Sequence, residues 1–117
     1  MANPNIVNVS TILGNTGVQA VTTSATAIVT NSAASNKVYK VNSLYVSNND
    51  TSVSYKITVE IFRSATAYPF AVSVSIAANS TLDVISKSLY LLEGDSIRLT
   101  ADTNSKLVAV CSWEELS

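Results

Sequence analysis

Apolar and polar residues alternate along much of the chain, which is the pattern of half-buried β-strands. Between Val53 and Ile61 every second residue is apolar, and the residues between them are Ser, Lys, Thr and Glu. A second stretch, from Tyr68 to Ile76, places apolar residues at the same spacing. The short connection between the two stretches predicts a β-hairpin through Ser64-Ala65-Thr66. Pro69 predicts that the second strand lies at a sheet edge or begins there.

Further extended stretches follow one another, separated by residues that favour turns. Residues 37–47 have apolar side chains of both parities, which predicts either a β-bulge or burial on both faces. The chain shows no stretch that combines a helix cap with a 3.6-residue apolar period. The other expected strands cover residues 18–30, 82–87, 89–92, 97–101 and 107–113. About seven or eight strands at this spacing predict an all-β fold, an antiparallel β-sandwich or jelly roll.

One domain accounts for the length of 117 residues. We expect residues 18–117 to form a single β-sandwich domain. Residues 1–17 differ because Gly14 and Gly17 interrupt a short apolar stretch and could form a hinge. Two interpretations stay open for this segment: a first strand of the same sandwich, or an N-terminal arm that adds a strand to a neighbouring subunit.

The composition favours a surface whose contacts are apolar or hydrogen-bonded and not ionic. Hydrophobic residues make up 47% of the chain, but charged residues make up only 13%, and 18 Ser, 12 Thr and 11 Asn supply most of the polarity. With a net charge of −1, the chain has no basic patch for nucleic acid or for an anionic membrane. It also has no apolar run long enough for a membrane helix and no signal-peptide pattern, so we expect synthesis in a cytoplasm. A weakly charged surface suits packing against copies of the same chain or a partner.

The sequence provides few groups for chemistry. Without histidine the chain has no Ser-His or Cys-His pair and no imidazole ligand for a metal, and three glycines form no phosphate-binding loop. Cys111 alternates with apolar residues, which predicts a small buried side chain. The segment Glu93-Gly94-Asp95 could contribute oxygen ligands to calcium, but a tight turn is the simpler interpretation. We therefore expect a non-enzymatic protein without cofactor, metal or catalytic residue.

Interface residues are expected in two places. The apolar N-terminal residues would make the contact if this segment is an arm. Tyr39 and Tyr45 are better candidates among the five tyrosines than Tyr55 and Tyr68, which have the apolar parity of the hairpin. Tyr55 and Tyr68 are expected in the core or at its rim, and Trp113 as a core anchor. The candidate interface residues are Ile6, Val7, Val9, Ile12, Leu13, Tyr39 and Tyr45.

Several segments resemble small virion structural proteins of tailed phages, especially marine cyanophages. The similarity covers nearly the whole chain, and its motifs are structural rather than catalytic. It is carried by residues 2–9 (ANPNIVNV), 21–30 (VTTSATAIVT), 42–48 (NSLYVSN), 82–87 (LDVISK), 92–95 (LEGD) and 112–115 (SWEE).

The resemblance implies a structural protein of the virion that contacts copies of itself and other virion proteins such as the major capsid protein. A small domain with a candidate arm favours a capsid decoration or cement subunit. Two alternatives remain: a neck, tail or fibre component, and a host-receptor or carbohydrate-binding module, which the tyrosines and the Ser/Thr/Asn-rich loops favour.

Overall fold

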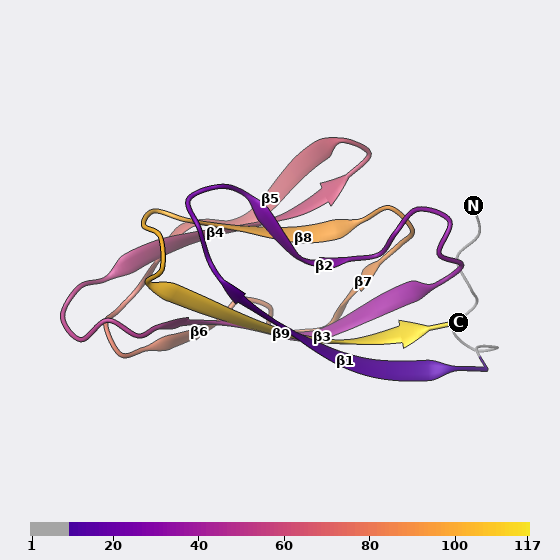
Figure 1. The fold of residues 1–117 in the computed structure, drawn as a ribbon, viewed down its shortest axis with the longest axis horizontal. Coiled ribbons are helices and arrows are strands. Elements are labelled where there is room, and N and C mark those ends of the chain that lie inside the picture. The colour runs from indigo at the N-terminus through magenta and orange to yellow at the C-terminus, as the bar shows by residue number, and fades with distance from the viewer. Residues whose placement is uncertain (1–9) are drawn as a thin grey trace.

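A computed structural model of the protein describes residues 10–117, which form nine β-strands and no helix (Figure 1). Short turns that contain Ser, Asn, Asp or Gly connect most of them, as the sequence predicts. The strands are β1 (Ile12–Ala20), β2 (Thr26–Thr30), β3 (Val38–Asn48), β4 (Tyr55–Arg63), β5 (Thr66–Ile76), β6 (Thr81–Asp83), β7 (Leu89–Leu91), β8 (Ser96–Ala101) and β9 (Leu107–Leu116).

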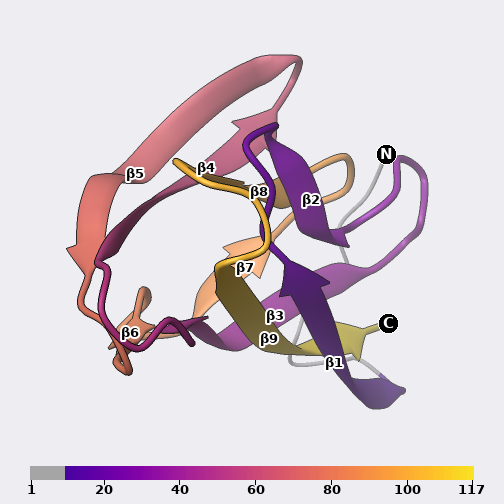
Figure 2. The same cartoon turned by 60° about the vertical axis from the view of Figure 1, so that its left-hand side comes forward.

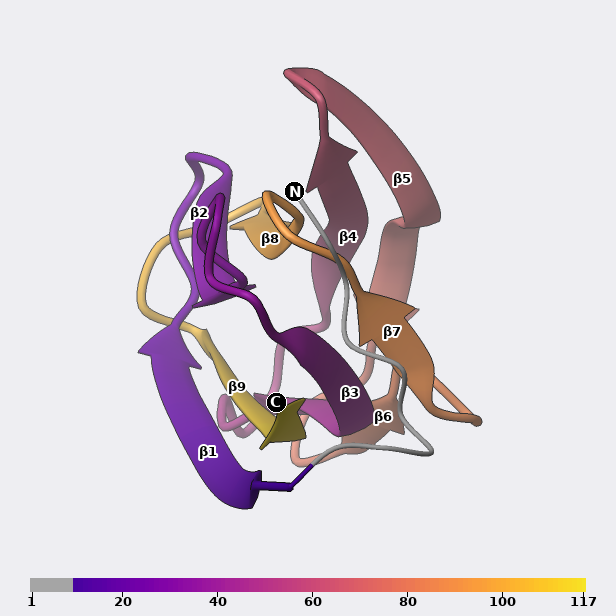
Figure 3. The same cartoon turned by 90° about the vertical axis from the view of Figure 1, so that its right-hand side faces the viewer.

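The strands form two antiparallel sheets that face each other (Figure 3). One sheet has the order β1-β9-β3-β6, with β7 also paired to β3, and the other has the order β2-β8-β4-β5. Because β6 and β7 pair with different parts of β3, they occupy one strand position with an interruption. Counted in this way, the eight strand positions have the sheet order of a jelly roll, with the consecutive strands β4 and β5 paired in one sheet. The all-β prediction is confirmed.

The predicted hairpin is present, and of the two alternatives for residues 37–47 the structure has the bulge. Strands β4 and β5 pair through the Ser64-Ala65 turn, and both turn residues have positive φ. The register of β3 against β9 shifts between Val41 and Ser43, which makes Asn42 the extra residue of a bulge. The bulge explains why apolar residues of both parities point into the core from this strand.

Strand β1 is part of the sandwich in this structure. It pairs with β9 in unbroken register from Ile12↔Leu116 to Ala20↔Val108, so the two glycines lie inside a strand and not at a hinge. Gly17 faces the other sheet at close range. A Cβ atom there would lie 3.0 Å from Trp113 Cζ3 and 3.2 Å from the carbonyl oxygen of Ile28.

The core fills the space between the sheets with aliphatic side chains from both layers. Strands β3, β4, β8 and β9 contribute most of them, and each fully buried Leu, Ile or Val contributes about 1.5–3 kcal/mol to stability. Two buried asparagines, Asn31 and Asn48, lie near opposite ends of β3 and bond backbone carbonyls. The fully buried apolar residues include Leu44, Val46, Ile57, Val59, Leu91, Ile97, Leu99 and Leu107.

Candidate assembly surfaces

Four ion pairs in the described part of the chain join eight of its fifteen charged residues. A hollow of about 430 Å³ lies between the tip of the β4–β5 hairpin and the β7–β8 turn, but its Arg63 and Asp95 form an ion pair. On the outer face of the second sheet, Arg98 bonds Glu60 and lies 3.9 Å above the centre of the Phe62 ring. At these two places the charges are therefore paired within the chain.

Residues 10–117 contain no group of three His, Cys, Asp or Glu side chains placed to hold a metal ion. The segment from Glu93 to Asp95 forms a turn, with Gly94 at φ 87°. Over the same range, no helix is long and apolar enough to cross a bilayer.

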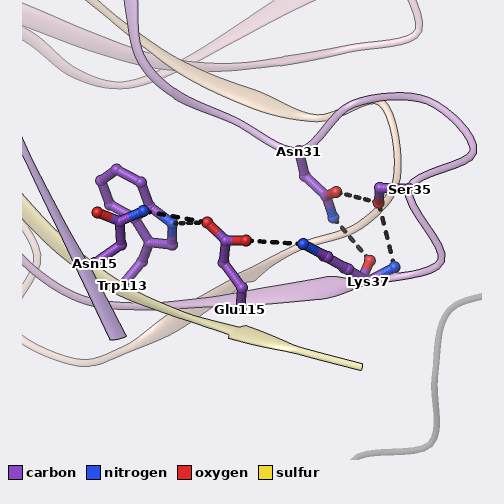
Figure 4. A network of polar contacts seen from close by, with 6 residues as sticks. All are labelled: Asn15, Asn31, Ser35, Lys37, Trp113 and Glu115. Atoms are coloured by element: carbon purple, nitrogen blue, oxygen red, sulfur yellow. Dashed lines mark hydrogen bonds and ion pairs between the residues drawn. The ribbon is translucent and has the colours of Figure 1, made fainter. Parts of the chain in front are cut away.

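A polar network closes one end of the sandwich (Figure 4). The Glu115 carboxylate accepts hydrogen bonds from Lys37 Nζ at 3.1 Å, Trp113 Nε1 at 3.3 Å and Asn15 Nδ2 at 3.4 Å. The Trp113 ring stacks on Tyr39, with 6.4 Å between the ring centres. The network therefore links β1, β9 and the segment before β3, and it fixes the aromatic pair between the sheets.

Glu115 should make the protein sensitive to acid. Partial burial raises the pKa of its carboxyl, but the hydrogen bonds from Lys37, Trp113 and Asn15 outweigh burial and lower the pKa below the ordinary value of 4.5. A group whose folded pKa is lowered stabilises the fold above its unfolded pKa, and this contribution disappears as pH falls through the folded value. We expect Glu115→Gln to lose stability near neutral pH and to approach the parent protein in acid.

Urea unfolding at both pH values measures this difference. Glu114→Gln is the matched control, because Glu114 lies next to Glu115 and bonds only Asn42 at 3.3 Å among the described contacts. An equal loss for Glu115→Gln at neutral and acidic pH would contradict the assignment.

Apolar side chains form a row on the outer face of the first sheet. Val18 of β1 pairs with Val110 of β9, and Val110 pairs with Tyr45 of β3. Val18 is 71% exposed and Tyr45 is 44% exposed. We call Val18, Val110 and Tyr45 the outer row. Isolated exposed apolar residues are common, but a row across three strands is a candidate contact surface.

A second apolar surface lies on β5, at the edge of the other sheet (Figure 2). Tyr68, Phe70 and Val72 are 56%, 41% and 64% exposed, and we call these three exposed side chains the β5 surface. They do not all share one face of the strand, because Tyr68 pairs with Ile61 whereas Val72 follows Ala71, the partner of the inward-facing Val59. No charged residue occurs between Arg63 and Asp83. Large exposed apolar side chains grouped on one uncharged strand form a candidate contact surface.

Of the seven predicted interface residues, the four that the structure describes do not form one surface. Tyr45 belongs to the outer row, whereas Tyr39 lies half-buried between the sheets against Trp113. Ile12 and Leu13 are both exposed in β1, and as neighbours in a strand they point to opposite faces. The other three, Ile6, Val7 and Val9, lie outside the described residues.

The β5 surface was missed by the sequence analysis, which placed Tyr68 in the core or at its rim because of its parity. Tyr68 does have the inward parity of its partner Ile61. The hairpin tip, however, stands clear of the facing sheet (Figure 1). A side chain on the inward face of the tip is therefore exposed to solvent. The available signal was the run of six apolar residues 67–72, since a strand with one buried face needs only alternate apolar positions.

No protein-family model and no curated protein matches the chain. A similar solved structure is a chain from Bacillus endospore appendages, which form a novel family of disulfide-linked pili. The alignment covers 100% of this chain and 94% of that chain, with a TM-score of 0.55 and 15% identical residues. At this identity the likeness concerns the fold alone.

The single cysteine of the chain differs from what disulfide-linked subunits require. Cys111 is buried in the core, as the alternation in β9 predicts. Burial raises the pKa of its thiol to about 12, so the reactive thiolate is nearly absent at neutral pH. Copies of this chain therefore have no accessible thiol with which to form a covalent link in the folded state.

We expect the folded protein not to react with a thiol-specific reagent at mildly alkaline pH, and to react with one equivalent after unfolding in denaturant. Absorbance of the released chromophore measures both states. Rapid reaction without denaturant would show that Cys111 is accessible and would contradict its burial.

Proposed function

We propose that this chain is a non-enzymatic structural subunit of a phage virion, and that it decorates the capsid through noncovalent contacts. The observation that carries the assembly role is the β5 surface, an edge strand with three exposed large apolar side chains and no charge. A partner that covers this surface stabilises the complex by roughly 25 cal/mol for each Å² of apolar area removed from water.

Two further observations support the proposal. The similarity in fold to a chain from Bacillus endospore appendages is compatible with an assembling protein. The sequence resemblance to small virion proteins of tailed phages supports the phage setting, with the major capsid protein as a partner. The decoration role rests on the small size of the domain and its apolar surfaces.

Purified particles test the virion assignment. Quantitative mass spectrometry should find this chain in them, with a copy number on the order of hundreds for a decoration subunit that follows capsid symmetry. A number on the order of tens or fewer would favour a neck, tail or fibre component. Absence from the particles would overturn the virion assignment.

A double variant tests the β5 surface. Tyr68→Ser with Phe70→Ser should reduce attachment to particles that lack the native subunit, while the melting temperature changes little because both side chains are exposed. Val53→Ser is the matched control, since Val53 is also exposed but lies before β4. Attachment that persists in the double variant would exclude β5 as the attachment surface.

Host-glycan binding is the alternative from another functional class. The exposed Tyr45 favours it, because Asp83 is its register partner on β6 and an aromatic side chain and a carboxylate on the same face could contact a sugar. A glycan array compares the parent protein with Tyr45→Ala. Binding that the variant loses would favour this alternative over decoration.

A further inference from the structure

The outer edge of β1 presents unpaired backbone groups in the described structure. Thr11 and Ser117 exchange both of their backbone hydrogen bonds, each at 3.0 Å. In an antiparallel pair these bonded positions alternate, so the N–H and C=O groups of Ile12, Gly14, Thr16 and Val18 point away from β9. One of these outward groups in the described range has a local partner, since the Thr16 N–H donates to Asn15 Oδ1 at 3.0 Å.

This edge lacks the features with which proteins protect edge strands from pairing. Strand β1 contains no proline and no charged residue, and its nine pairs with β9 show no register shift. Strand β5 is protected in comparison. It contains Pro69, has two register shifts against β4, and holds Ser73 at φ 48°. Of these two long edges, only β1 lacks these protective features and can pair with a further strand along its length.

We propose that β1 pairs in antiparallel orientation with β1 of a second copy of this chain, so that the two five-stranded sheets continue into one. Charge favours a second copy as the occupant. A two-fold contact places a segment against itself, where like charges would meet, and the first charged residue of the chain is Lys37. A charged partner strand would need opposite charges on β1 for electrostatic complementarity, and β1 has no charged residue.

The exposed apolar side chains of β1 indicate the register of its pairing with the second copy. Ile12 and Val18 are 62% and 71% exposed and share the outer face of the sheet. The register that pairs Ile12 with Val18 of the second copy also pairs Gly14 with Thr16, all of them positions with outward backbone groups. Two-fold symmetry repeats each pair, so four apolar side chains become covered. The outer rows of the two copies then lie on one continuous surface.

The contact deepens the proposed assembly role and rests on it for its place in the particle. The dimer itself can be measured with the purified full-length chain. Sedimentation equilibrium over a range of concentrations should show reversible doubling of the 12.3 kDa mass. Val18→Lys should weaken the dimer more than about tenfold, because the lysine would lose water beside Ile12 of the second copy. Val53→Lys, a control at another exposed valine, should dimerise as the parent does.

Amide hydrogen exchange of the parent protein tests the same edge without a substitution. The outward amides of Gly14 and Val18 should exchange more slowly at concentrations that favour the dimer, and amides bonded to β9 should change little. A parent that stays monomeric, or a Val18→Lys dimer of unchanged affinity, overturns the proposal. A monomer that is nevertheless found on particles overturns this contact alone, whereas a dimer that is absent from particles overturns only the virion assignment.

Discussion

Asn31→Ala is expected to lower the free energy of unfolding by about 3 kcal/mol, because several buried polar groups lose their partner at once. The Asn31 amide is fully buried and donates to the carbonyl oxygens of Lys37 at 2.9 Å and Leu91 at 3.0 Å. Its oxygen accepts a hydrogen bond from the Ser35 hydroxyl at 2.5 Å. Alanine fills none of these roles, and water has little access to the carbonyl of Leu91.

Urea unfolding measures the loss, and Asn42→Ala is the control because Asn42 is exposed. Asn31→Asp isolates the donor role. It keeps the oxygen that Ser35 bonds, but it turns a carboxylate oxygen toward two carbonyls, so it should destabilise the fold at least as much at neutral pH. A loss for Asn31→Ala no larger than that of the control would mean that water replaces these bonds.

Asp95→Asn is expected to lower stability by about 2 kcal/mol, because a neutral amide cannot accept all the bonds of a carboxylate. Asp95 is buried and accepts from Arg63 Nε at 2.8 Å, Arg63 Nη2 at 2.5 Å and the backbone N–H of Leu92 at 2.9 Å. The Arg63 side chain is about half exposed, so water can solvate its guanidinium after the change. This limits the loss to less than that of a fully buried ion pair.

Thermal unfolding at neutral pH measures this effect, with the exposed Asp102→Asn as the control. The two changes should not be additive. The Asn31 backbone bonds the Asp95 carbonyl at 2.9 Å and the Gly94 N–H at 2.7 Å, so either change loosens the same contact between loops. The double variant should lose less than the sum of the single losses, and strict additivity would show that the two loops respond independently.

Local signals in the sequence were sufficient for the hairpin and for most strands, because alternation and turn residues act over short distances. They were wrong for residues 18–30, which were expected as one strand but contain the end of β1 at Ala20 and the start of β2 at Thr26. The orientation of individual side chains depended on one residue that these signals did not locate. Tyr39 and Tyr45 have the same parity, yet Tyr39 packs between the sheets and Tyr45 faces outward. The bulge at Asn42 reverses the parity between them. The sequence indicated a bulge, but not its position.

The surfaces depended on tertiary structure. Alternation placed Tyr68 on the inner face of its strand, and this is correct within the sheet. It could not show that the opposite sheet ends before it reaches that part of the hairpin. In the same way, the two apolar positions Ile12 and Val18 gain meaning only when β1 is known to be an edge strand. Edge positions follow from the order of strands in the sheets, which local patterns do not determine.

The pairing of β1 with β9 also bears on how the chain folds. Ile12 pairs with Leu116, so the first strand of the sheet waits for the last one to be synthesised. Topologies with such long separations fold slowly, over milliseconds to seconds. Throughout synthesis the uncharged segment before Lys37 would be present without its partner strand, which is when edge strands aggregate. Production of this protein should therefore improve at low temperature, where the hydrophobic association of unfinished chains is weaker.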